Sequence, residues 1–391
     1  MSGHKHLFML KMWILLAVFL PAFHLSAGEA EMLKLFDRAH NLSPRKNLLL
    51  SPYGIEQCFG LAACGSGKQS GRELADILGI DPSVSRPGIP AETYRTRATF
   101  NSFNAVFYNR NYTLLPGFIR LCRNIYNGKI YKLDFRRPAE CAKIINALIK
   151  KESRDLLDNA ISHDLLTNDD AAVLLNVLYF KGGWSEPFST ANTERKTFYP
   201  ADQAPCDTDM MYAKQEYAYF EKDGIQAVFL PFDDYRFKML LIKTADKTAP
   251  LNKVTGFLAK NGLRYIEKNS SYGYEVHIHL PKLKLNGDND LIPLLKAAGM
   301  NVIFDPHHSD IDRMIAEQPL YIAGAKQLVK LNVDEKGAEV AAATIILPKA
   351  ASAPGTDEVK VREFRADHPF VIVLFDWKHR NILLTAAVLR P

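Results

Sequence analysis

The segment from residue 332 to residue 344 constrains the fold of this chain more than any other part of the sequence. It reads Asn-Val-Asp-Glu-Lys-Gly-Ala-Glu-Val-Ala-Ala-Ala-Thr, so an acidic stretch with one glycine leads into mostly small, uncharged residues. Counted from Ala338, alternate residues would form the two faces of a strand. One face consists of Ala338, Val340, Ala342 and Thr344, and the other of Glu339, Ala341 and Ala343. Because the first face can be buried without burying a charge, the segment predicts a latent strand that could be added to a sheet. We call it the reserve strand.

The residues that follow have the composition of an exposed loop. Residues 345–362 contain Pro348, Pro354 and Gly355, and they end in a charged run. Proline and glycine interrupt regular structure, and a run of charges favours solvent. The sequence therefore predicts a latent strand joined to an exposed loop.

Hydrophobic periodicity indicates a mixed architecture. Apolar residues recur near the helical period in three segments, 56–63, 71–78 and 141–157. Strand-like segments follow at 172–180, 218–231, 237–243, 274–280, 325–333, 370–376 and 382–389. Helices dominate the first half and strands the second, without regular alternation, which predicts an α+β fold.

The first 27 residues have the layout of a secretory signal peptide. Two lysines precede the apolar run 12–20, and small residues follow up to Ala27. The apolar run is several residues short of the roughly twenty that span a bilayer, so we predict no membrane span. Cleavage after Ala27, or alternatively after Ala30, would make the protein secreted and extracellular, or periplasmic if the host is a Gram-negative bacterium.

Residues 28–391 are predicted to form one domain. No Gly/Ser-rich linker, low-complexity tract or internal repeat divides them. The five cysteines are too few and too irregularly spaced for a disulfide framework. The net charge of +6 is spread along the chain, which favours a solvated surface over binding of nucleic acid or another polyanion. A basic patch assembled by folding is the alternative.

The sequence lacks common motifs of enzymatic chemistry. It contains no Gly-x-Ser-x-Gly elbow, no phosphate-binding loop and no His-Glu-x-x-His. Residues 65–67, Gly-Ser-Gly, are interpreted as a turn that ends a helix. His277 and His279 share a face of a predicted strand, and His307 and His308 are adjacent, but neither pair has a third ligand at a suitable spacing. We therefore expect no metal and no cofactor.

Six motifs occur in a fixed order along the chain. The first two are residues 47–55, and residues 133–135 together with 144–146. The third is residues 175–184 together with Pro187, Phe188, Thr193 and Phe198. The last three are residues 280–282, residues 334–337 and residues 364–370. Together with the reserve strand they resemble the serpins, and the resemblance covers nearly all of the chain after the signal. It implies a single serpin-like domain with three β-sheets, about nine helices and an exposed reactive-centre loop.

The resemblance also implies inhibition by conformational change. A serine or cysteine protease attacks the loop and forms an acyl-enzyme; the loop then inserts as a new central strand and distorts the protease before deacylation. Nucleophilic attack belongs to the protease, so the chain itself is expected to be no enzyme. It would be a monomer whose partner is a serine protease. The competing interpretation is a non-inhibitory carrier or chaperone of the same fold.

In this resemblance, residues 335–344 form the hinge and residues 345 to about 362 form the reactive loop. The hinge site residues are Gly337, Ala338, Glu339, Val340, Ala341, Ala342, Ala343 and Thr344. Gly337 supplies backbone freedom where the loop must fold over. A charge at Ala338, Val340 or Ala342 would be costly to bury, so its absence from all three positions favours an inserting hinge over an Ala-rich loop that never inserts.

The reactive bond follows from the family's usual spacing. Counted from Glu335, this spacing places the bond between Ala351 and Ser352. A small apolar residue suits the shallow primary pocket of elastase-like proteases. Lys349 is the alternative, which would direct the chain to a trypsin-like or cysteine protease, and Ala350 is the third choice.

The resemblance assigns two further groups of residues. A latch at the end of the central sheet comprises Trp184, Lys282 and Glu335. A cluster that governs opening of the sheet comprises Ser51, Asn176 and Gln327. Gln327 stands where the family commonly has a histidine, so a titratable switch is lost there, and Gly54 stands where a serine is expected.

Overall fold

The computed structural model describes residues 27–80, 98–158, 160–167, 170–317, 319–338 and 360–391. These residues form seven α-helices, where the sequence predicted about nine helices in the whole chain. The helices are α1 (Ala27–Leu42), α2 (Pro52–Ala63), α3 (Lys68–Leu78), α4 (Pro116–Tyr126), α5 (Pro138–Glu152), α6 (Asn252–Lys268) and α7 (Leu291–Ala297). Three single turns of 3₁₀-helix add to them: His163–Leu165, Thr190–Asn192 and Val302–Phe304.

Three β-sheets confirm the predicted α+β class. The first sheet has the order β1-β16-β15-β9-β8-β7, the second β14-β10-β6-β5, and the third, here the long sheet, β11-β12-β13-β4-β2-β3. The first sheet comprises β1 (Leu48–Leu50), β7 (Ala218–Lys222), β8 (Ile225–Pro231), β9 (Phe237–Thr244), β15 (Phe370–Asp376) and β16 (Asn381–Val388). The second comprises β5 (Glu194–Phe198), β6 (Cys206–Glu216), β10 (Tyr274–Pro281) and β14 (Lys360–Arg365). The long sheet comprises β2 (Thr99–Asn109), β3 (Lys129–Leu133), β4 (Ala172–Gly183), β11 (Leu283–Asp290), β12 (Lys326–Asp334) and β13 (Gly337–Ala338).

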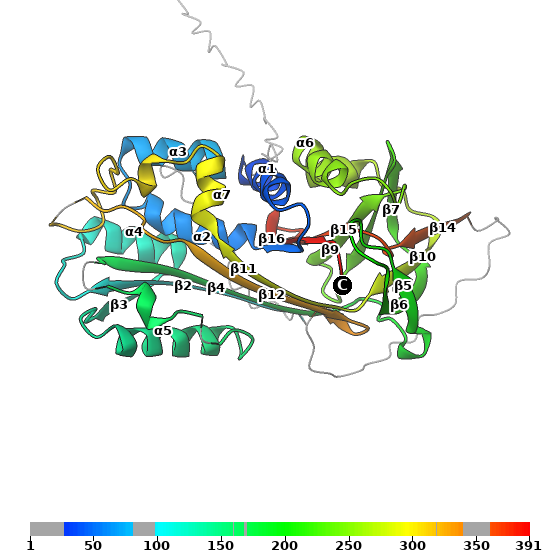
Figure 1. The fold of residues 1–391 in the computed structure, drawn as a ribbon, viewed down its shortest axis with the longest axis horizontal. Coiled ribbons are helices and arrows are strands. Elements are labelled where there is room, and N and C mark those ends of the chain that lie inside the picture. Colours follow the sequence, from blue (N-terminus) through cyan, green and yellow to red (C-terminus); the bar gives the residue numbers. More distant parts are fainter. Residues whose placement is uncertain (1–26, 81–97, 159, 168–169, 318, 339–359) are drawn as a thin grey trace, which may run out of the picture.

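The elements form layers around the first sheet. Strand β9 is apolar on both faces: Leu240 and Ile242 pack into a core shared with the helices, whereas Met239 and Leu241 pack into a core shared with the long sheet. A strand covered on both faces reads as a continuous apolar run, which is how this segment appears in the sequence. Helix α5 covers the opposite face of the long sheet (Figure 1).

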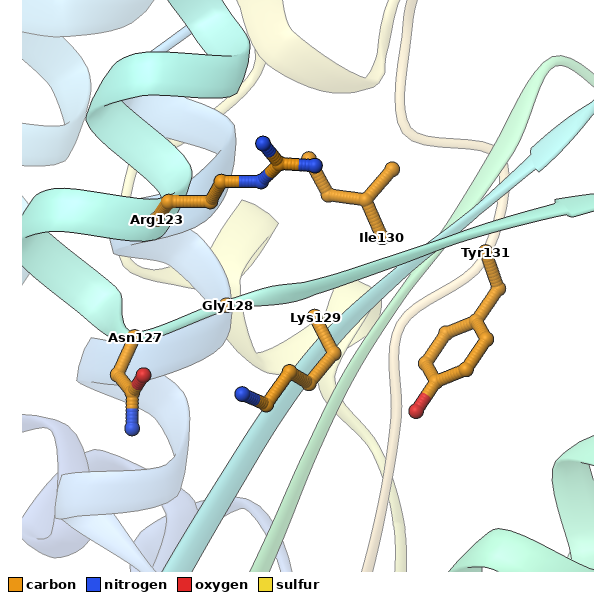
Figure 2. Close-up of a pocket in the computed structure, with 6 residues that line it drawn as sticks. All are labelled: Arg123, Asn127, Gly128, Lys129, Ile130 and Tyr131. Atoms are coloured by element: carbon orange, nitrogen blue, oxygen red, sulfur yellow. The ribbon is translucent and has the colours of Figure 1, made fainter.

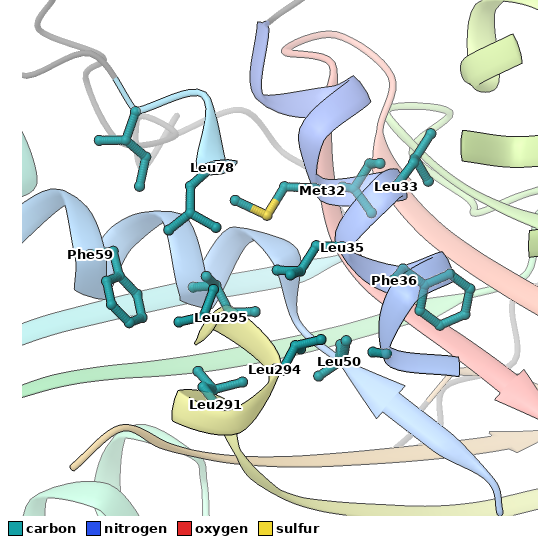
Figure 3. Close-up of a cluster of buried hydrophobic side chains, with 14 of the residues drawn as sticks. Met32, Leu33, Leu35, Phe36, Leu50, Phe59, Leu78, Leu291, Leu294 and Leu295 are labelled. Carbon is teal, nitrogen blue, oxygen red and sulfur yellow. The ribbon is translucent and has the colours of Figure 1, made fainter. Parts of the chain in front are cut away.

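Leucine and aromatic side chains join the helices to this core (Figure 3). Side chains of α1, α2, α3, α7 and β1 meet in one cluster that includes Met32, Leu33, Leu35, Phe36, Leu50, Phe59, Leu78, Leu291, Leu294 and Leu295. Complete burial of a side chain such as Phe36 contributes about 1.5–3 kcal/mol. The sheets are therefore held by a large apolar interior.

Two predicted elements were wrong in their bounds. The predicted helix 141–157 ends at Glu152, because Arg154 and Asp155 adopt left-handed backbone angles with φ of 52° and 65°. The predicted strand 218–231 is a hairpin of β7 and β8, turned by Asp223 and Gly224 with φ of 54° and 73°.

Candidate functional site at the hinge end of the long sheet

The two residues of β13 occupy a slot between β12 and β4. Ala338 pairs with Val333 of β12 and with Gly182 of β4, and Gly337 pairs with Asp334 and Gly183, all antiparallel. Ala338 is 2 % exposed. In the described part of the chain β12 and β4 share no direct pairing, so β13 is the element that joins them. The first two residues of the predicted hinge strand thus lie inside the sheet.

Glycines line this slot because there is no room for side chains. A Cβ atom added to Gly337 would overlap the carbonyl oxygen of Gly182. A Cβ atom on Gly182 would come within 2.7 Å of the Phe232 ring. The slot at this end of the sheet therefore admits only small residues.

An ion pair holds the turn between β12 and β13. Nζ of Lys282 lies 3.0 Å from Oε2 of Glu335, and the Thr193 hydroxyl donates to Oε1 of Glu335 at 2.9 Å. Burial opposes ionisation of Glu335, but the hydrogen bonds from its own N–H, Lys282 and Thr193 outweigh burial and lower its pKa. The Glu335 side chain is 9 % exposed and the Lys282 side chain is 40 % exposed, so the carboxylate is the buried member of this ion pair.

Trp184 binds the same turn from the side of β4. Its indole N–H donates to the carbonyl of Asp334 at 3.0 Å, and its backbone N–H donates to the carbonyl of Lys336 at 2.9 Å. The indole stacks on Phe232, with centroids 4.8 Å apart. The structure therefore brings Trp184, Lys282 and Glu335 around one turn. Thr193 was among the motif residues of the resemblance, but no role was predicted for it; the structure shows that its hydroxyl binds Glu335.

The residues Ser51, Asn176 and Gln327 surround Gly54. The Ser51 N–H donates to Oε1 of Gln327 and the Gln327 amide donates to the carbonyl of Ser51, both at 2.9 Å. Asn176 donates instead to Ser102 and Asn104 of β2. A Cβ atom on Gly54 would lie 3.0–3.3 Å from polar atoms of all three cluster residues. Close packing around residue 54 thus explains why this chain has glycine at a position where the serpin resemblance predicts serine.

The other predicted site residues lie outside the described residues. These are the rest of the hinge, Glu339, Val340, Ala341, Ala342, Ala343 and Thr344, and the residues of the reactive bond, Lys349, Ala350, Ala351 and Ser352. After these residues the chain continues as β14, which pairs in parallel with β10. The predicted reactive loop therefore connects the slot of the long sheet to the edge of the second sheet.

The predicted histidine pairs bind neighbouring side chains. His277 contacts Tyr212 and Glu275, and both His277 and His279 lie 3.5–3.6 Å from Glu363. His308 contacts Asp305. Over the described ranges, no three His, Cys, Asp or Glu side chains are arranged to hold a metal ion. Within the same ranges, no helix combines the length and the apolar character needed to cross a membrane.

Comparison with known proteins agrees with this geometry. Residues 29–391 match the family model described as Serpin (serine protease inhibitor). Antichymotrypsin-2 of Bombyx mori is 25 % identical over 365 residues, covering 92 % of this chain and 95 % of that protein. Leukocyte elastase inhibitor of Bos taurus is 25 % identical over 364 residues, covering 90 % and 94 %. The crystal structure of Serpin48 from Tenebrio molitor matches with a TM-score of 0.78 and 21 % identity, over 93 % of this chain and 97 % of that one. The chain therefore belongs to the serpin family, whose members are mostly protease inhibitors rather than enzymes.

Proposed function

We propose that this chain is an irreversible suicide-substrate inhibitor of serine proteases. A target protease acylates the reactive loop, and the freed hinge inserts into the long sheet between β12 and β4. The observation that supports this most is the pairing of Gly337 and Ala338 with both neighbouring strands. Insertion of the hinge would lengthen β13, which already pairs with both β12 and β4.

The register of β13 defines where each hinge residue would go. If the strand continued in the same antiparallel register, Val340 would lie opposite Phe180 and Leu331, which both belong to the apolar core between the sheets. Glu339 would then fall on the opposite face, across from Lys181. The alternation found in the sequence therefore suits the slot: apolar residues face the core, and the one acidic residue meets a lysine.

Thr344 would complete the inserted strand. In the continued register it lies between Asn176 of β4 and Gln327 of β12. These are two of the three residues assigned to the sheet-opening cluster. Seven residues, from Ala338 to Thr344, would thus fill the slot as far as this cluster.

The target is proposed to be an elastase-like serine protease that cleaves between Ala351 and Ser352. The small side chain of Ala351 suits a shallow primary pocket. Cleavage after Lys349 would instead mark a trypsin-like or cysteine protease as the target, and Ala350 is the third candidate. The inhibitor would act as a monomer.

We also propose that the chain is exported after removal of residues 1–27. Glu29 of α1 is 4 % exposed, accepts a hydrogen bond from the Leu263 N–H at 3.0 Å and lies 3.9 Å from Arg380. Cleavage after Ala30 would remove this buried carboxylate, so Ala27 is preferred. The mature protein would be secreted, or periplasmic in a Gram-negative host.

Incubation of the mature protein with elastase, and separately with trypsin, tests the function. We expect a complex with elastase that survives a denaturing gel, and intact mass showing a released fragment that begins at Ser352. Release after Lys349 would redirect the search to trypsin-like targets. Clean cleavage without a complex for every protease, and no rise in melting temperature of the cleaved protein, would refute inhibition and leave a carrier or chaperone.

A further inference from the structure

The turn between β8 and β9, here called the wall turn (residues 232–236), forms one wall of the hinge slot. The Phe232 ring lies 2.7 Å from the position that a Cβ atom on Gly182 would take. The Asp233 N–H donates to the carbonyl of Gly183 at 2.9 Å, so the wall turn is hydrogen-bonded to β4. Because Gly182 and Gly183 pair with β13 and the interior is closely packed, a shift of the wall turn would change the shape of the slot.

A buried ion pair anchors the wall turn. Nε and Nη2 of Arg236, the last residue of the turn, lie 3.0 and 2.7 Å from Oδ2 of Asp376. The Arg236 side chain is 10 % exposed and the Asp376 side chain is 0 % exposed. The guanidinium also lies 4.8 Å from the centre of the Phe237 ring. Charged hydrogen bonds at a buried site are strong and directional, so they fix the end of the wall turn.

Asp376 is itself held by the turn between β15 and β16. Its Oδ1 accepts hydrogen bonds from the N–H groups of Lys378 and His379 at 3.0 and 3.1 Å. Nδ1 of His379 lies 2.8 Å from Oδ2 of Asp376. The next residue, Arg380, binds Glu267 of α6 at 3.1 Å. The carboxylate of Asp376 therefore links the wall turn, through a second turn, to a helix.

Stability alone is a poor explanation for charges at this place. The other six residues of β15 are apolar, and the whole strand is buried. Removing two charges from water is costly, and well-packed apolar residues in place of a buried ion pair often leave a protein equally or more stable. Directional hydrogen bonds add a fixed position, which matters where the slot has no spare room.

We infer that Arg236 and Asp376 are positioning residues for insertion of the hinge. The inference rests on the proposed inhibition by insertion. The ion pair holds Phe232 beside Gly182 at the spacing that admits the hinge backbone. The protease still acylates the reactive loop when this pair is weakened, because neither residue belongs to the loop. Insertion then becomes slower, and more of the inhibitor is cleaved as a substrate.

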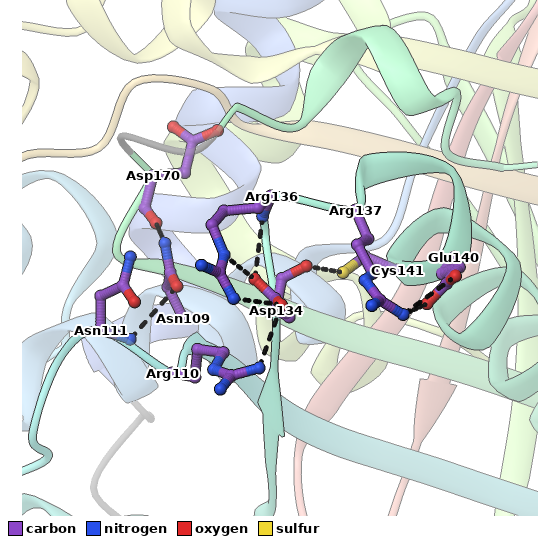
Figure 4. A network of polar contacts seen from close by, with 9 residues as sticks. All are labelled: Asn109, Arg110, Asn111, Asp134, Arg136, Arg137, Glu140, Cys141 and Asp170. Atoms are coloured by element: carbon purple, nitrogen blue, oxygen red, sulfur yellow. Dashed lines mark hydrogen bonds and ion pairs between the residues drawn. The ribbon is translucent and has the colours of Figure 1, made fainter.

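The surface of the long sheet provides a matched control. Nε and Nη2 of Arg136 lie 2.8 and 2.9 Å from the carboxylate oxygens of Asp134 (Figure 4), but the Arg136 side chain is 58 % exposed. A cavity of about 420 Å³ at the end of α4 is also a surface feature, since Arg123 and Lys129 lie on opposite sides of β3 (Figure 2). None of the residues that line this cavity belongs to the wall turn or the slot. Arg136→Lys therefore repeats the chemistry of Arg236→Lys away from the slot.

The fluorescence of Trp184 reports on the wall turn without any protease. In a Trp377→Phe background, Trp184 is the sole tryptophan of residues 28–391. It is 3 % exposed and stacks on Phe232. We expect Arg236→Lys to raise the acrylamide quenching constant about twofold or more, because lysine cannot reproduce the two hydrogen bonds of the guanidinium. Arg136→Lys should leave this constant unchanged.

The second readout is the number of inhibitor molecules consumed per elastase molecule inactivated. We expect Arg236→Lys to raise this number about fivefold at an unchanged rate of loop cleavage, and Arg136→Lys to behave like the parent. A role in stability alone would shift the urea midpoint but neither readout. If Arg236→Lys does not fold, Arg236→Gln combined with Asp376→Asn replaces it, because this pair leaves no unpaired buried charge.

The two readouts separate this inference from the proposed function. A parent protein that traps no protease would refute inhibition, while quenching would still decide whether the ion pair positions the wall turn. Quenching of the Arg236 variant equal to that of Arg136→Lys would overturn the inference in either case. With a parent that does trap elastase, equal consumption of the two variants would overturn it as well.

Discussion

Replacement of Ala338 by glutamate tests the slot between β12 and β4. Ala338 is 2 % exposed and belongs to the apolar core between the sheets. It lies between Val333 and Gly182, so a carboxylate there would have no adjacent cation. Burial of an unpaired polar or charged group costs several kcal/mol. We therefore expect Ala338→Glu to oppose insertion of the hinge strongly.

The same substitution should change the stability of the uncleaved protein little. Before cleavage, β13 can leave the slot and expose the new carboxylate. Undocking loses a few ladder hydrogen bonds at about 1 kcal/mol each, while freeing the backbone of both β13 residues regains about 1–2 kcal/mol per residue. After cleavage, insertion would require the carboxylate at residue 338 to be buried in the slot. A cost of about 3 kcal/mol in the transition state would slow insertion more than a hundredfold.

The assay is the number of inhibitor molecules consumed per elastase molecule inactivated. We expect Ala338→Glu to be cleaved as a substrate with little complex formed, while its melting temperature before cleavage stays close to that of the parent. Ala338→Ser, which is small and uncharged, is the control and should retain the complex. Equal complex yield for glutamate and serine would refute the reasoning. If the parent protein forms no complex, the variants are compared instead by the rise in melting temperature that each shows after cleavage of the loop.

Three further predictions concern charged groups. Glu335→Lys should slow inhibition and favour loop insertion into a neighbouring molecule, seen as polymers on a native gel; an unchanged rate without polymers would contradict the latch. Lys181→Glu should slow inhibition about fivefold, and adding Glu339→Lys should restore the rate if the two residues meet on insertion. Burial opposes ionisation of Asp367, but hydrogen bonds from His368 and a lysine outweigh it and lower its pKa to about 2, below the usual 3.8. Its ionisation therefore stabilises the fold above pH 4 and is lost as pH falls towards 2, so Asp367→Asn should lower the free energy of unfolding in urea by roughly 2 kcal/mol at pH 6. A similar loss at pH 2 would show that the effect is not electrostatic.

Sequence patterns predicted the strands whose faces are uniformly apolar. The segment 172–180 became β4, and the strands of the first sheet near the C-terminus lie close to their predicted bounds. Strand β2 was missed because polar residues interrupt its alternation. Asn104, for example, is 5 % exposed and donates to Gln57 at 3.0 Å. A buried polar residue with a distant partner has no signature in local periodicity.

Predictions for the site divide in the same way. The resemblance to serpins predicted that Trp184, Lys282 and Glu335, which are distant in sequence, belong to one site. In the structure these three residues lie around one turn. Local patterns alone could not bring them together, because each belongs to a different strand or turn. The contribution of Thr193 was missed, since a hydroxyl that binds a buried carboxylate looks like any surface threonine in the sequence.

The sheet and the loop carry different parts of the proposed function. The described residues define the proposed acceptor: a slot between β12 and β4 that is narrow at Gly182 and apolar at Phe180 and Leu331, with Gln327 of β12 hydrogen-bonded to Ser51 farther along. In the proposed mechanism these features would limit which hinge sequences can insert, and they would be independent of the residue that a protease recognises. Target choice would therefore change with residues 349–352 while the trap stayed the same, whereas a charge facing the core at any alternate position from Ala338 would abolish trapping for every target.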